Sequence, residues 1–208
     1  MLFRDRDDAA RRLAEALAQY RGQNPLVLAI PRGAVPMARI IAEALDGEVD
    51  VVLVRKLRAP GNPEFAIGAV DETGWTYLAD HARHVAGSQE YIEREKAAQM
   101  EVMRERRASY TPIRPPHDPA GRIVIVVDDG LATGSTMIAA LHALRARKPQ
   151  KLVCAVPVAP PDTLDKVSSY ADEMVCLSAP ELFYAVGQFY QSFPQVSDEE
   201  VIASLASD

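Results

Sequence analysis

Short apolar runs, separated by segments with helical spacing, constrain the fold of this 208-residue chain most. Each run has the length of a strand and lacks the alternating polar positions of a half-exposed strand. The runs are Leu26–Ile30, Val51–Val54, Ile123–Val127, Leu152–Val156 and Met174–Leu177. Because such runs suit strands buried on both faces, they predict an α/β fold with a mainly parallel central sheet of about five strands and helices on both faces.

Helical spacing joins most of these runs, as βαβ units require. The connecting helices are expected at residues 35–45, 136–147 and 163–170. A further helix is expected from Asp7 to Tyr20, with Asp7 or Asp8 as its cap, and a final amphipathic helix is expected after Ser197.

The chain between the second and third runs is too long for a simple crossover. Residues 57–80 contain several prolines and glycines, which predict a loop or a short hairpin. Residues 90–107 predict a highly charged helix with a solvated surface, and residues 111–119 predict an extended, proline-rich connector. We therefore expect a long flexible loop insertion at residues 57–121.

Composition excludes several classes of function. The net charge of −6 and the pI near 5.3 argue against a general binder of nucleic acids or anionic membranes. No apolar run approaches the ~18–20 residues of a membrane helix, and the first residues do not resemble a signal peptide. The two cysteines, Cys154 and Cys176, are too few to staple the fold, so a cytoplasmic location is expected.

The strongest functional signal directly follows the third run. Two carboxylates end the strand, a short loop with two glycines follows, and a helix then begins. The residues are Asp128, Asp129, Gly130, Leu131, Ala132, Thr133, Gly134, Ser135 and Thr136. A glycine-containing loop before a helix N-terminus favours phosphate, and ligands of open α/β sheets bind at the carboxyl ends of strands.

The adjacent carboxylates would repel a phosphate unless they meet hydroxyl groups or a cation. A phosphorylated sugar with free vicinal hydroxyls and bound Mg²⁺ satisfies both demands. The spacing does not fit a Walker A loop, a dinucleotide fingerprint or a nucleophile elbow. An acidic turn that merely caps a helix is the structural alternative.

Positions 123–136 resemble the signature of the type I phosphoribosyltransferases, in which an apolar run and two acidic residues precede a loop ending in Thr-Gly-x-Thr. The resemblance covers about residues 25–178. It implies an Mg²⁺-dependent enzyme in which a nitrogenous acceptor, a base or an amine, displaces pyrophosphate from 5-phosphoribosyl 1-pyrophosphate. Asp128 and Asp129 would bind the ribose hydroxyls near Mg²⁺, without being assigned as direct metal ligands, and residues 130–136 would hold the 5-phosphate.

Two further segments match the family in position. Arg32 and Gly33 follow the first run, where the family binds pyrophosphate, and a non-proline cis peptide would precede Arg32. Arg55 and Lys56 follow the second run, at the root of a mobile loop, and would neutralise the departing pyrophosphate. The alternatives are a plain turn for the first segment and surface charge for the second.

The resemblance also bears on the acceptor. Enzymes of this family that act on 6-oxopurines place an aspartate where this chain has Ala132, which counts against hypoxanthine and guanine. A variable C-terminal hood, expected at residues 179–208, often contacts the acceptor. Its aromatic residues either contact the acceptor or form a hydrophobic plug; they are Phe183, Tyr184, Phe189 and Tyr190.

The expected organisation is a single domain of residues 1–208, with a core of about residues 1–178 that includes the insertion, followed by the hood. A homodimer is expected from the resemblance alone. The alternative function is a non-catalytic regulator that senses phosphoribosyl pyrophosphate or a nucleotide on the same fold. Intact Arg32, Arg55 and Lys56 favour the enzyme, because a sensor has less need of leaving-group chemistry.

Overall fold

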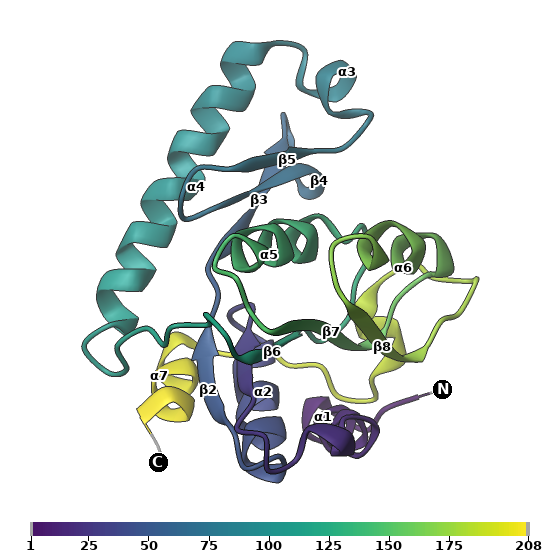
Figure 1. Cartoon of the computed structure of the whole chain (residues 1–208). Helices are drawn as coiled ribbons and strands as arrows, with labels where there is room; N and C mark the ends of the chain where they lie inside the picture. Colours follow the sequence, from purple (N-terminus) through teal and green to yellow (C-terminus); the bar gives the residue numbers. More distant parts are fainter. Residues whose placement is uncertain (1, 207–208) are drawn as a thin grey trace.

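The central sheet has five parallel strands in the order β2-β1-β6-β7-β8. It is seen in a computed structural model that describes residues 2–206, so the expected boundaries at residues 1 and 208 lie outside the described residues (Figure 1). The strands are β1 Leu26–Ala29, β2 Glu48–Val51, β6 Ile123–Val127, β7 Lys151–Val158 and β8 Glu173–Ser178. The predicted parallel sheet is therefore confirmed.

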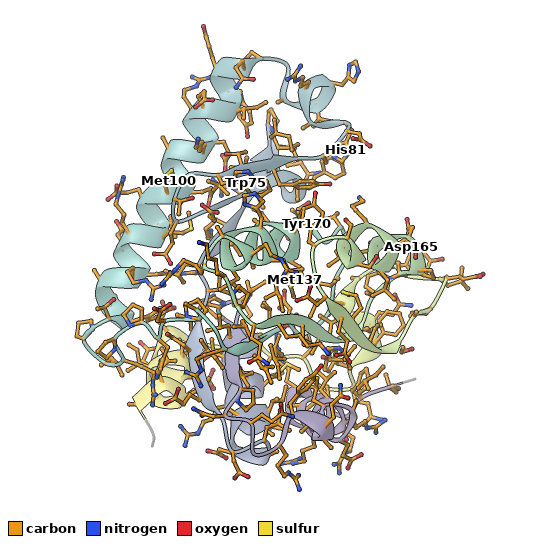
Figure 2. All side chains as sticks on the ribbon, viewed as in Figure 1. Trp75, His81, Met100, Met137, Asp165 and Tyr170 are labelled. Carbon is orange, nitrogen blue, oxygen red and sulfur yellow. The ribbon has the colours of Figure 1, made fainter. Side chains whose placement is uncertain are left out.

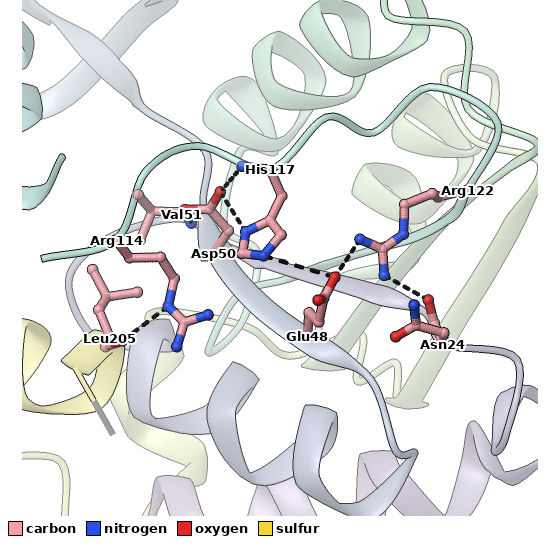
Figure 3. Close-up of polar contacts among 8 residues, drawn as sticks. All are labelled: Asn24, Glu48, Asp50, Val51, Arg114, His117, Arg122 and Leu205. Carbon is pink, nitrogen blue, oxygen red and sulfur yellow. Dashed lines mark hydrogen bonds and ion pairs between the residues drawn. The ribbon is translucent and has the colours of Figure 1, made fainter. Parts of the chain in front are cut away.

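The second strand begins three residues earlier than the run Val51–Val54 indicates. Its polar start is held in place by contacts outside the sheet (Figure 3). The His117 backbone N–H donates to Asp50 Oδ2 over 2.7 Å, and Arg122 donates to Glu48 Oε2. Because these partners satisfy the buried Asp50 and the partly exposed Glu48, strand β2 includes residues that an apolar pattern leaves out.

Helices cover both faces of the sheet. Figure 1 shows α1 and α2 on one face and α5 and α6 on the other. Side chains of β6 alternate between the two hydrophobic clusters, with Ile125 in one and Val126 in the other. The helices are α1 Arg6–Ala16, α2 Ala34–Ala44, α5 Ser135–Arg145 and α6 Pro161–Ser168. No helix within residues 2–206 is long and apolar enough to cross a membrane.

The insertion contains a second sheet, which the prediction of a loop or short hairpin missed. Its three antiparallel strands are β3 Val54–Ala59, β4 Asn62–Asp71 and β5 Thr76–Leu78. Helices α3 Ala82–Ala86 and α4 Gln89–Tyr110 follow. The sheet packs on α5, where the ring of Trp75 stacks on His142 with 3.6 Å between centroids (Figure 2 labels Trp75).

Helix α4 is not the solvated surface helix that its charge pattern suggests. One of its faces is buried along the insertion, and the buried residues include Glu95 and Gln99. The remaining members of this face are Ile92, Met103 and Tyr110. Because two of the buried positions carry polar residues, the apolar spacing of a half-buried helix is interrupted in the sequence.

The chain ends differ partly from expectation. Helix α1 begins at Arg6, because the side chain of Asp5 accepts a hydrogen bond from the Asp8 N–H, so the prediction of Asp7 or Asp8 as cap was wrong. A short 3₁₀ turn, η1 Ala18–Tyr20, follows α1. The hood contains η2 Val186–Phe189 and α7 Asp198–Ala206. Ser197 caps α7 as predicted, since its hydroxyl accepts from the Glu200 N–H over 3.1 Å.

Candidate active site

The candidate site forms where the central sheet reverses its strand order. The chain passes from β1 to β2 on one side, whereas β6 is followed by β7 and β8 on the other. Ala29 and Val127 are register partners at the ends of β1 and β6, so the loops after them begin side by side. The expected cis peptide joins Pro31 and Arg32 in the first of these loops. Such a reversal is where open α/β sheets bind ligands.

A cavity of about 350 Å³ lies between these loops. The expected site residues line it, except Ser135, whose side chain is buried at the start of α5. The lining members of that set are Arg32, Gly33, Arg55, Lys56, Asp128, Asp129, Gly130, Leu131, Ala132, Thr133, Gly134 and Thr136. Arg58 and the hood residue Val186 line it as well. The fold therefore brings the separate sequence signals into one cavity.

Asp128 and Asp129, here called the acid pair, form part of the cavity wall. The Asp129 N–H donates to Asp128 Oδ1 over 2.9 Å. Arg6 Nε donates to Asp129 Oδ2 over 3.0 Å, and the Tyr190 hydroxyl donates to the Asp129 carbonyl over 2.6 Å. Asp129 is therefore held through both its side chain and its backbone.

The environment of the acid pair favours uptake of a proton. Burial raises the pKa of both carboxyl groups, and the neighbouring charge of Asp129 raises the pKa of Asp128 further. At Asp129 the Arg6 guanidinium opposes the effect of burial and favours the ionised form. The first proton is therefore expected on Asp128.

The loop of residues 130–136, here called the phosphate loop, ends at the N-terminus of α5. Gly134 precedes the helix with φ of +80°, a left-handed conformation that suits glycine. The Thr163 hydroxyl of α6 donates to the Ala132 carbonyl over 2.7 Å and ties the loop to the core. Because the first N–H groups of a helix carry partial positive charge, this end of α5 can attract an anion.

Four cations line the cavity and are here called the basic wall: Arg32, Arg55, Lys56 and Arg58. Helix α4 holds two of them. Arg58 Nε donates to Glu95 Oε1 over 2.9 Å, and Arg55 Nε donates to Gln99 Oε1 over 2.9 Å. Gln99 in turn donates to Glu95 Oε1 over 2.6 Å, so the two arginines share one buried network.

The acidic partners of the basic wall compensate its positive charge only in part: Glu95 pairs with Arg58, and Asp198 of α7 lies 3.9 Å from Arg32. Burial lowers the pKa of Arg55, and the neighbouring charges of Arg106, Arg58 and Arg32 lower it further. An anion with several charges would relieve the repulsion among these arginines. The cavity thus joins a helix N-terminus, two carboxylates and a cationic wall.

The aromatic residues of the hood fall into two groups. Phe189 and Tyr190 are buried, as the hydrophobic-plug alternative requires. Phe183 packs against Phe189, and Tyr184 is 85% exposed. Phe183 and Tyr184 line a separate cleft of about 490 Å³, which shares Ala132 and Thr133 with the first cavity. Contact with an acceptor therefore remains a prediction for these two residues only.

Three contact residues were missed by the sequence predictions. Glu95 and Gln99 could have been found, since they continue the spacing of Ile92 and Met103 on α4. Arg6 could not, because its partner Asp129 lies 123 positions away and nothing in the local pattern links them.

Other candidate groups do not assemble a site. Within residues 2–206, no three His, Cys, Asp or Glu side chains gather as metal ligands. Cys154 is buried in β7, and burial raises the pKa of its thiol. A buried, protonated thiol is a poor nucleophile.

Known proteins resemble this chain over nearly its whole length. The family model of the phosphoribosyl transferase domain matches residues 4–193. The "Putative phosphoribosyl transferase Rv0571c" of Mycobacterium tuberculosis is 44% identical over 208 residues, which are 98% of this chain and 46% of that protein. The chain thus spans about half the length of this relative. The crystal structure of TT1426 from Thermus thermophilus is 48% identical with a TM-score of 0.82, over 99% of this chain and 98% of that one.

Proposed function

Because this chain belongs to the phosphoribosyl transferase family, we propose that it transfers the phosphoribosyl group of 5-phosphoribosyl 1-pyrophosphate to a nitrogenous acceptor. The observation that supports this best is the single cavity in which the acid pair, the phosphate loop and the basic wall meet. Each part matches one portion of the donor: the ribose hydroxyls, the 5-phosphate and the pyrophosphate.

The roles follow from charge and hydrogen-bonding capacity. The phosphate loop binds the 5-phosphate through backbone N–H groups, and the acid pair accepts hydrogen bonds from the ribose hydroxyls. The basic wall neutralises the pyrophosphate. A nitrogen of the acceptor forms a bond to the anomeric carbon while the bond from that carbon to the pyrophosphate oxygen breaks. The electron pair leaves with pyrophosphate, and the acceptor nitrogen releases a proton.

The protein accelerates this exchange mainly by positioning and electrostatics. Arg55 and Lys56 stabilise the negative charge that grows on the leaving group, provided they are in place before the reaction. Gln99 and Glu95 satisfy that condition for Arg55 and Arg58, because they hold both guanidinium groups at the cavity.

Mg²⁺ fits the acid pair in part. Carboxylate oxygens are ligands that Mg²⁺ prefers, but residues 2–206 contain no cluster of three protein ligands. Asp128 and Asp129 would therefore attract the ion to the cavity by their negative charge, without being assigned as its direct ligands. When bound, Mg²⁺ supplies charge neutralisation for the pyrophosphate.

The acceptor is proposed not to be a 6-oxopurine. Ala132 provides no carboxylate at the fifth position of the phosphate loop, so no group there can exchange a proton with a purine ring nitrogen. The open cleft beside Ala132, with Phe183 and Tyr184 in its lining, leaves room for other bases or amines.

The test measures pyrophosphate release from the donor with Mg²⁺ across a panel of bases and amines. Turnover with one acceptor class supports the enzyme. Tight donor binding without turnover for any acceptor would favour the regulator instead. The double variant Asp128→Asn with Asp129→Asn should lose the rise in melting temperature that donor and Mg²⁺ cause, and an unchanged rise would contradict the proposed site.

A further inference from the structure

Arg6 reaches the acid pair from outside the cavity. It is the first residue of α1, its side chain is only 12% exposed, and its Nε lies 3.0 Å from Asp129 Oδ2. Arg6 does not line the 350 Å³ cavity but lines a groove with Pro194 and Glu200. Asp129 therefore separates Arg6 from the space in which the donor is proposed to bind.

Arg6 also contacts the hood. Its guanidinium donates to the Pro194 carbonyl and lies 4.0 Å from the centre of the Phe193 ring. The preceding backbone pairs with the same segment, since the Phe3 N–H donates to the Phe189 carbonyl over 2.8 Å. The hood is thus linked to the acid pair through the N-terminal segment as well as through Tyr190.

Gly33 makes room for this contact. A Cβ atom there would lie 2.6 Å from Asp129 Oδ2 and 2.9 Å from Arg6 Nη2, closer than atoms pack. The backbone of Gly33 is helical, with φ of −57°, so space rather than an unusual conformation requires glycine. Gly33 thus lines the cavity, as expected from the resemblance, and also lies against the Arg6–Asp129 pair.

We infer that Arg6 is a positioning residue that holds the side chain of Asp129 in its orientation, so that the ribose hydroxyls of the donor find an acceptor oxygen. This rests on the proposed function. Asp129 is contacted by Arg6 from α1, by Asp128 from its own loop and by the Tyr190 hydroxyl from the hood. Arg6 donates the hydrogen bond that fixes Asp129 Oδ2, and its loss would free this carboxylate to turn away from the cavity.

The test compares the full-length variants Arg6→Gln and Arg12→Gln. Arg12 is a matched control: it lies on α1, pairs with Asp8 and faces the Phe3 ring at 5.4 Å, without contacting Asp129. The affinities for 5-phosphoribosyl 1-pyrophosphate with Mg²⁺ and for inorganic pyrophosphate, which has no ribose hydroxyls, are measured by calorimetry. Arg6→Gln should weaken binding of the donor roughly tenfold and leave the affinity for pyrophosphate unchanged.

Arg6→Lys keeps a cationic hydrogen-bond donor and should restore most of the donor affinity, whereas Arg12→Gln should match the wild type. Wild-type donor affinity in Arg6→Gln, an equal loss in Arg12→Gln, or an equal loss of pyrophosphate affinity in Arg6→Gln would overturn the inference.

A second measurement requires no donor. A crystal structure of Arg6→Gln should show the Asp129 carboxylate turned away from its wild-type position, while Arg12→Gln leaves it in place. An unmoved carboxylate in Arg6→Gln would overturn the role of Arg6 even if the donor binds. If the wild type does not bind the donor but the carboxylate turns as expected, the proposed function fails while the positioning by Arg6 stands.

Discussion

The ionised carboxylate of Asp128 is proposed to serve ligand binding, but it lowers the stability of the folded protein. Because burial and Asp129 raise the pKa of Asp128, the ionised carboxylate is less stable in the folded chain than in the unfolded one. The stabilising contribution of Asp128 is complete below its ordinary pKa, near 3.8, and is lost as the pH rises through the raised value. Above that raised pKa the folded protein therefore carries a destabilising charge that its proposed ligand requires.

Asp128→Asn should accordingly stabilise the protein at pH 8 by about 1 kcal/mol, which raises the melting temperature by roughly 2–4 °C in a chain of this size. The gain should shrink at pH 4, where the wild-type carboxyl is increasingly protonated. Calorimetric melting at both pH values checks this, with the exposed Asp165→Asn as control. A lower melting temperature at pH 8, or an equal gain at both pH values, would contradict the argument.

Some helices and strands can be predicted from the sequence alone, and others cannot. The buried strands of the central sheet were predictable because they are uninterrupted apolar runs, and the acid pair was predictable because it directly follows one of them. Strands β3 and β4 were not predictable, because Arg55, Lys56 and Arg58 interrupt the apolar pattern of β3. Pro63 and Glu64 stand near the start of β4. Their pairing depends on long-range contact with α4 and α5, which local patterns do not encode.

Helix α4 acts on the basic wall through Gln99. Substitution Gln99→Leu should remove the bond that holds Arg55 Nε and should weaken binding of pyrophosphate with Mg²⁺ roughly tenfold, about 1.4 kcal/mol. Gln89→Leu is the matched control, since Gln89 lies on the same helix and bonds only the exposed Glu93. Calorimetric titration with pyrophosphate measures both variants. Wild-type affinity in Gln99→Leu would show that Arg55 needs no support from α4.

On the scale of the whole molecule, the insertion shares its hydrophobic core with the central sheet. Leu57 and Ile67 of the second sheet belong to the same buried cluster as Ile125, and Ala69 belongs to the cluster on the other face with Val126. Such long-range continuity, like the contact of Arg6 with Asp129, follows from the assembled fold and not from any segment alone. It predicts that insertion and core unfold together.

Trp75 provides the means to test this, because it is the single tryptophan of the chain and stacks on His142 at the junction between insertion and core. Unfolding in urea, followed by tryptophan fluorescence and by far-ultraviolet circular dichroism, should give coincident midpoints, as expected for one cooperative transition. A fluorescence midpoint at clearly lower urea would show that the insertion detaches first. Joint unfolding implies that the arginines on β3 keep their place beside the acid pair for as long as the central sheet itself is folded.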